Sequence, residues 1–118
     1  MNGTFTDYDA DRLPRVVLSY LDARDRKDHA EAAGTFAPDA TVLDDGHTYE
    51  GIDTIRAWIR NASSEYTFTS TRLGQQITDE ETVTVRIRLD GDFPGGTVVL
   101  RHQFQLGDDA IRRLTIAI

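Results

Sequence analysis

Hydrophobic positions in the first half of the chain repeat with helical spacing. From Leu13 onward, apolar side chains fall at i, i+3, i+4, i+7 and i+8, namely at Leu13, Val16, Val17, Tyr20 and Leu21. Pro14 stands in the first turn, where a missing backbone N–H costs nothing, so we expect the helix to begin near Asp11. Tyr20 lies in the middle of the face that this helix buries.

Two further helices and a hairpin are predicted before residue 62. Asp28-His29-Ala30-Glu31 resembles a capping box that opens a short second helix, which carries Phe36 and is stopped by Pro38. A short strand over Thr41–Asp44 then precedes Asp45-Gly46, a strong hairpin turn, and a return strand over 47–50. A third helix is expected from about Ile52 to Asn61.

After Ser64 the period changes from helical to alternating. A strand is expected from Tyr66 to Ile77, and the next one buries Val83, Val85, Ile87 and Leu89 on one face. The following strand turns inward the side chains Val98, Leu100, His102, Phe104 and Leu106, and Leu114, Ile116 and Ile118 close the sheet. Helices followed by a long antiparallel meander predict an α+β fold, with the helices packed on one concave face of the sheet. A cleft between that face and the helices is a common place for a pocket.

Length and composition describe one folded unit. The chain has 118 residues, of which 39% are hydrophobic and 28% charged, so it has room for one core. Residues 1–10 are polar and patternless and are expected to form a flexible arm, and residues 11–118 a single domain. The chain has no cysteine, no apolar run long enough for a membrane span, and no signal-peptide pattern at its start, so a cytoplasmic location is expected.

Charge narrows the class of partner. A formal net charge of −7 disfavours phosphate backbones, and the sequence has neither a basic cluster nor a basic amphipathic helix. We therefore expect no nucleic acid and no membrane as partner, and a small, mostly uncharged organic molecule instead. The acidity is explained by solubility alone.

Three polar side chains are directed by periodicity toward the core. They are Tyr20 on the helical stripe, Asp44 on the strand face of Val42, and His102 between Leu100 and Phe104. Burying a carboxylate or an imidazole is costly without partners, which disfavours chance placement. Each has a structural alternative: a tyrosine buried for its ring, an aspartate bracing a turn, and a histidine satisfied in the core. One pocket would explain all three together.

A family resemblance rests on several segments. Val16-Val17-Leu18-Ser19-Tyr20, the run Phe36-Ala37-Pro38-Asp39-Ala40-Thr41-Val42-Leu43-Asp44, Tyr49 to Arg56, and Thr97-Val98-Val99 to Phe104 are similar to the SnoaL-like group of the nuclear transport factor 2-like superfamily, most of all to ketosteroid isomerases. The resemblance runs from Leu13 through most of the chain. It implies a cone-like α+β barrel, with three N-terminal helices on a strongly curved, mostly antiparallel sheet, and a homodimer.

The resemblance also implies roles for individual residues. Tyr20 matches the isomerase tyrosine that donates a hydrogen bond to the developing oxyanion, and Asp44 matches the aspartate that moves the proton. The isomerases hold a protonated aspartate where this chain has His102. The residues expected to line a substrate pocket are Val17, Phe36, Val42, Tyr49, Trp58, Leu100 and Phe104.

These observations leave three kinds of function open. The first is a cofactor-independent isomerase, cyclase or dehydratase that acts next to the carbonyl of an apolar substrate, with Asp44 as base and with Tyr20 and His102 stabilising the enolate. The second is a non-catalytic binder of a small hydrophobic ligand, and the third is a structural dimerisation module.

Other chemistries find less support in the sequence. No cofactor is expected, and no metal, since the turn explains Asp44 and Asp45 beside His47. An epoxide hydrolase of this fold would need an Asp-Arg-Asp set in its pocket, whereas the arginines are expected mostly on solvent-facing positions.

Overall fold

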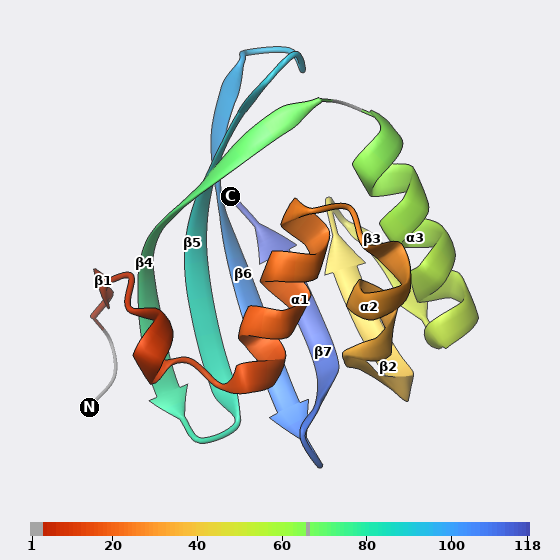
Figure 1. The fold of residues 1–118 in the computed structure, drawn as a ribbon, viewed down its shortest axis with the longest axis vertical. Coiled ribbons are helices and arrows are strands. Elements are labelled where there is room, and N and C mark those ends of the chain that lie inside the picture. Colours follow the sequence, from red (N-terminus) through yellow and green to blue (C-terminus); the bar gives the residue numbers. More distant parts are fainter. Residues whose placement is uncertain (1–3, 66) are drawn as a thin grey trace.

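The sheet follows the order β1-β4-β5-β6-β7-β2-β3 and curves around the helices (Figure 1). The computed structural model describes residues 4–65 and 67–118, without the side chains of residues 63–65. The helices of this part are α1 (Arg15–Asp25), α2 (His29–Gly34) and α3 (Ile52–Glu65), with a 3₁₀ turn, η1 (Ala10–Arg12). Its strands are β1 (Thr6–Asp7), β2 (Phe36–Asp44), β3 (His47–Glu50), β4 (Phe68–Asp79), β5 (Thr82–Gly91), β6 (Thr97–Gly107) and β7 (Ala110–Ala117). The expected α+β class and cone-like, mostly antiparallel sheet are confirmed.

All neighbouring strands pair antiparallel except β2 and β7, which run parallel. The long strands β4, β5 and β6 form the meander that the alternating pattern predicted, and α1 and α2 lie in front of the sheet (Figure 1). Core side chains come from the helices and from the inner face of the sheet, including Val17, Leu21, Ile55, Ile87 and Phe104. The core therefore lies between the two layers, as the pattern indicated.

The second helix is shorter than the sequence suggested. It ends at Gly34, and Phe36 and Pro38 lie in β2, so the prediction that Phe36 belongs to a helix stopped by Pro38 is wrong. The physical reason is pairing with a distant strand, since Phe36 is opposite Ile111 of β7. Proline is tolerated because the pairing is irregular between Phe36 and Thr41, where no ladder bond requires its N–H.

Several boundaries also differ. The first helix begins at Arg15 rather than near Asp11, because Pro14 forms its N-cap and η1 stands before it. The third helix continues to Glu65, and β4 begins at Phe68, while the predicted strand start at Tyr66 lies outside the described residues. The two-residue strand β1, which no pattern indicated, pairs with β4. The flexibility of the N-terminal arm stays a prediction.

The hairpin before α3 has the conformation that its sequence predicted. Asp45 and Gly46 have φ values of 52° and 77°, both in the left-handed region that a tight two-residue turn of this kind requires. Asp44 and His47 pair directly across the turn. Asp44 is thereby fixed at the very end of β2.

Candidate functional site

A cavity of about 900 Å³ opens between the helices and the concave face of the sheet. Its wall is mainly apolar and includes Ile59, Phe68, Leu89, Val98, Leu100 and Ile116. This volume lies in the range of small-molecule sites. Tyr20, Asp44 and His102 all belong to the same lining.

The strand register explains how Asp44 and His102 reach one cavity. Ile116 of β7 is paired with Asp44 on one side and with His102 on the other. Directly paired residues face the same side of a sheet, so these three side chains form one row across β2, β7 and β6. Adjacent strands are about 4.8 Å apart, which puts the acid and the imidazole roughly two strand spacings from each other.

Asp44 is held by the third helix. The indole Nε1 of Trp58 donates a hydrogen bond of 3.0 Å to Oδ2 of Asp44. The carboxylate is half-buried, and Trp58 itself is 7% exposed. One carboxylate oxygen is thus engaged by a rigid donor, which orients the other.

Tyr20 is a buried phenol surrounded by aromatic rings. It is 2% exposed, and its ring meets Phe36 and Phe104 edge-on at centroid distances of 5.5 and 5.8 Å. Burial raises the pKa of Tyr20 to about 12; the positive charge of Arg24 opposes this shift, and the negative charges of Asp44 and Asp25 add to it. The hydroxyl therefore keeps its proton at neutral pH and can act as a donor.

His102 is a neutral imidazole of defined tautomer. Its Nε2 lies 3.0 Å from Nη1 of Arg24, and a guanidinium can only donate, so Nε2 accepts and the proton resides on Nδ1. Burial first, and the charge of Arg24 second, hold the pKa of His102 well below its usual value, while the backbone of Leu100 opposes the shift. Nδ1 has no well-formed hydrogen bond within the described residues.

Arg24 is a charged cavity residue that the sequence did not predict, as are Asp25 and Lys27. It was included among arginines expected mostly on solvent-facing positions, yet it lines the cavity with a side chain only 16% exposed. The available signal was its spacing: Arg24 stands four residues after Tyr20 and three after Leu21, so it continues the buried stripe of α1. A long charged side chain at the end of such a stripe can reach the pocket while its helix covers the core.

The sequence profile of the SnoaL-like domain matches residues 17–113. This chain belongs to the SnoaL-like domain family. A comparison with curated proteins gives no match.

Solved structures resemble this SnoaL-like domain over most of its length. A candidate polyketide cyclase from Sinorhizobium meliloti is 33% identical, with a TM-score of 0.87 over 93% of this chain and 100% of the other. A protein of ketosteroid isomerase-like fold from Catenulispora acidiphila, in complex with trimethylamine, is 18% identical, with a TM-score of 0.77 over 89% and 85%. A Mycobacterium tuberculosis protein in complex with estradiol-17β-hemisuccinate is 14% identical, with a TM-score of 0.73 over 87% and 90%. At these identities, the structures from Catenulispora acidiphila and Mycobacterium tuberculosis show that the fold is shared.

The residues expected to bind substrate divide into two groups. Trp58 and Leu100 belong to the cavity lining of this SnoaL-like domain. The others stand behind that lining: Val17, Phe36, Val42 and Phe104 are buried in the core, and Tyr49 packs on Trp58 at a centroid distance of 6.1 Å. Phe36 and Phe104 therefore contribute by supporting the ring of Tyr20.

A second set of contacts ties α1 to the sheet beside the cavity. Arg72 of β4 donates to Asp22 at 2.8 Å, to Asp25 at 2.9 Å and to the hydroxyl of Tyr8 at 2.8 Å. Ser70 donates to the other oxygen of Asp25 at 2.9 Å. These bonds hold in place the end of α1 that carries Arg24.

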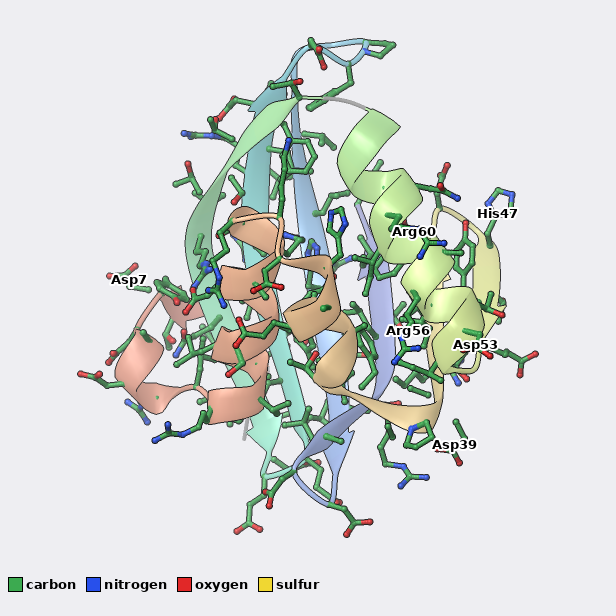
Figure 2. The ribbon with its side chains drawn as sticks, turned by 45° about the vertical axis from the view of Figure 1, so that its right-hand side comes forward. Asp7, Asp39, His47, Asp53, Arg56 and Arg60 are labelled. Atoms are coloured by element: carbon green, nitrogen blue, oxygen red, sulfur yellow. The ribbon has the colours of Figure 1, made fainter. Side chains whose placement is uncertain are left out.

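The described residues contain no group of three His, Asp or Glu side chains suited to a metal ion. His47, near the acidic turn, lies on the outside of the molecule beside α3 (Figure 2), where its Nδ1 is 3.1 Å from the carbonyl oxygen of Asp45. Among these same residues, no helix has the length and apolar character needed to cross a bilayer.

Proposed function

We propose that this SnoaL-like domain is a cofactor-independent acid/base enzyme that acts on the carbon next to a carbonyl group of an apolar substrate. The observation that carries the proposal is the convergence of Asp44, Tyr20 and His102 on one mainly apolar cavity. A carboxylate can remove the proton, and a protonated phenol can stabilise the oxygen that becomes negative.

The chemical step moves one proton and redistributes one electron pair. Oδ1 of Asp44 takes a proton from the carbon, the C–H electrons form the carbon–carbon double bond of the enolate, and the carbonyl electrons move to oxygen. Tyr20 donates a hydrogen bond to that oxygen. Where the enolate is conjugated with a second double bond, return of the proton from Asp44 to the far carbon completes an isomerisation. In a cyclisation the enolate carbon attacks a second carbonyl, and the proton passes from Asp44 to the new alkoxide.

His102 acts in this scheme as a neutral group. Its Nε2 already accepts from Arg24, so Nδ1–H is its remaining donor; Nδ1 is buried, and the ring has to turn for this hydrogen to reach a substrate oxygen. Its low pKa keeps it from becoming a second cation. This differs from the protonated aspartate that ketosteroid isomerases use for the same oxygen, although both groups donate without bearing a negative charge.

The proposed proton transfer can be measured without knowing the natural substrate. We expect the protein to exchange the hydrogens next to the ketone of estrone for deuterium in D₂O, followed by mass spectrometry. Asp44→Asn is expected to lower this exchange rate by about 10²–10⁴-fold while the fold is kept. Asp39→Asn is the matched control, because it removes the same charge from an exposed position of the same strand that lies outside the cavity lining. Equal exchange in wild type and Asp44→Asn would eliminate Asp44 as the base.

A second candidate function is non-catalytic binding of a small hydrophobic ligand. Asp44 is only half-buried and already accepts a hydrogen bond from Trp58, which suits an orienting group as well as a base. Related folds are solved with estradiol-17β-hemisuccinate and as a designed 17-OHP binder. Binding of a steroid without any deuterium exchange at its ketone would favour this alternative.

A further inference from the structure

The guanidinium of Arg24 is incompletely satisfied although it is largely removed from water. Nη1 donates to His102, and Nη2 lies 3.3 Å from Oδ1 of Asp25. Nε is buried and has no hydrogen-bond partner within the described residues. A guanidinium has five N–H donors in a planar fork; Nη1 and Nη2 each carry two of them, so these terminal nitrogens retain capacity for an acceptor from the cavity that Arg24 lines.

The charge of Arg24 is also only partly balanced by its neighbours. His102 accepts its hydrogen bond as a neutral ring and brings no negative charge. Asp25 is shared, since Ser70 and Arg72 donate to it at 2.9 Å each, closer than the 3.3 Å that separates it from Arg24. A desolvated cation in this situation attracts an anionic group into the cavity.

Positive and negative groups stand at different places along the cavity wall. Asp44 is at the end of β2, whereas His102 is two strands away on β6. The Nε2 of His102 accepts a hydrogen bond from Arg24. Ile116 separates them in the row across the sheet, and Val98 and Leu100 belong to the same lining. A ligand in the cavity therefore meets an acid at the end of β2 and a cation beside His102, with an apolar wall around both.

We propose that the cavity is selective for an apolar molecule that carries a carboxylate, and that Arg24 is the residue that determines this specificity. The inference rests on the proposed function insofar as it takes the cavity to be the substrate site. Arg24 binds the carboxylate through charge-assisted hydrogen bonds from the guanidinium nitrogens that face the cavity.

Two steroids that differ in one group provide the test. One carries a 17β-carboxylic acid and the other the methyl ester of that acid, so they share their rings, and only the acid is charged at pH 7. We expect isothermal titration calorimetry to show that wild type binds the acid about 10- to 100-fold more tightly than the ester. Arg24→Gln is expected to reduce this ratio to about one, mainly by weakening binding of the acid.

Two further variants control for folding and for general charge. Arg24→Lys keeps the charge without the planar fork and is expected to retain a preference of several-fold for the acid. Arg26→Gln removes the same charge from an exposed side chain two residues away and is expected to keep the wild-type ratio. Thermal melting followed by circular dichroism confirms that each variant is folded.

Equal binding of acid and ester by wild type, binding of neither steroid, or an unchanged preference in folded Arg24→Gln would overturn the inference. Because the readout is affinity, it is independent of the deuterium exchange that tests Asp44. Loss of exchange in every protein with a preserved acid preference would refute the proposed chemistry and leave the role of Arg24 intact. Deuterium exchange without any preference for the acid would refute the role of Arg24 and leave the proposed chemistry intact.

Discussion

The indole Nε1 of Trp58 donates to Oδ2 of Asp44 at 3.0 Å, and this bond joins α3 to the end of β2. Trp58 thus does more than provide an apolar wall for the cavity. It orients the carboxylate that stands next to the hairpin turn, and Tyr49 of β3 packs against its ring. Trp58 holds the acid, and Tyr49 on the return strand of the hairpin supports the ring of Trp58. A positioned catalytic group requires this kind of support.

Replacing Trp58 by phenylalanine tests this support. Trp58→Phe keeps an aromatic ring and removes the donor, so Asp44 becomes free to rotate. We expect deuterium exchange of estrone to slow by about 10- to 100-fold, because a small misplacement of a reacting group is costly. The free energy of unfolding, measured with urea, is expected to fall by only about 1–2 kcal/mol, from the smaller ring. Unaltered exchange in this variant would show that the bond is structural only.

Removing the hydroxyl of Tyr20 tests its role as donor. Tyr20→Phe preserves the ring contacts with Phe36 and Phe104 and is expected to lower the exchange rate by about 10²–10³-fold, with the melting temperature changed little. Tyr49→Phe is the matched control, since Tyr49 is outside the cavity lining. Similar rates in the two variants would remove Tyr20 from the mechanism.

The buried imidazole makes stability depend on pH. The pKa of His102 is well below 6.5 in the folded protein, so as the pH falls below about 6.5 the unfolded chain binds a proton that the folded protein does not. Acidification therefore costs stability, by up to about 1.4 kcal/mol per pH unit while this difference persists.

Urea denaturation between pH 7 and pH 5 measures this loss. His102→Gln, whose side-chain oxygen can still accept from Arg24, is expected to show a shallower decline than wild type. His47→Gln replaces an exposed histidine and is expected to decline as wild type does. Parallel curves for wild type and His102→Gln would contradict the neutral, buried state of His102.

Arg72 provides a test of the contacts beside the cavity. Its side chain is 15% exposed and bonds to Tyr8, Asp22 and Asp25, so Arg72→Gln removes the partner of Asp22 and leaves Asp25 with Ser70 and Arg24. We expect the free energy of unfolding to fall by about 1–3 kcal/mol, from the loss of charged hydrogen bonds to partly exposed carboxylates. Arg88→Gln removes an exposed arginine paired with Asp90 and is expected to cost about 0–1 kcal/mol. Equal losses in the two variants would show that the Arg72 contacts carry no special weight.

Local patterns were sufficient for most of the fold. The stripe of α1, the Asp45-Gly46 turn and the alternation of β5 and β6 each depend on neighbours in sequence, and each is present in the structure. The first half of β2 was predicted as helix because its strand character depends on β7, a partner distant in sequence. Proline at position 38 was interpreted as a helix stop for the same reason.

The sequence predicted the inward-pointing polar residues of the candidate site, together with Trp58 and Leu100 of its wall. Tyr20, Asp44 and His102 were selected because their positions conflict with an apolar face, and all three lie in the cavity lining. Arg24 was missed because an arginine at the end of a helical stripe is compatible with solvent. The tautomer of His102 and the engagement of Asp44 by Trp58 depend on contacts between separate elements, which spacing alone does not reveal.

The parallel pairing of β2 with β7 has a consequence for the order of folding. Asp44 and His102 are brought into one row because β7 lies between β2 and β6 in the sheet. In the sequence, β4, β5 and β6 all come between β2 and this partner. Pairing across so long a loop is slow compared with the closure of a hairpin. The helices and the meander can thus assemble early, while the acid and the imidazole meet in a late step, when the final strand docks.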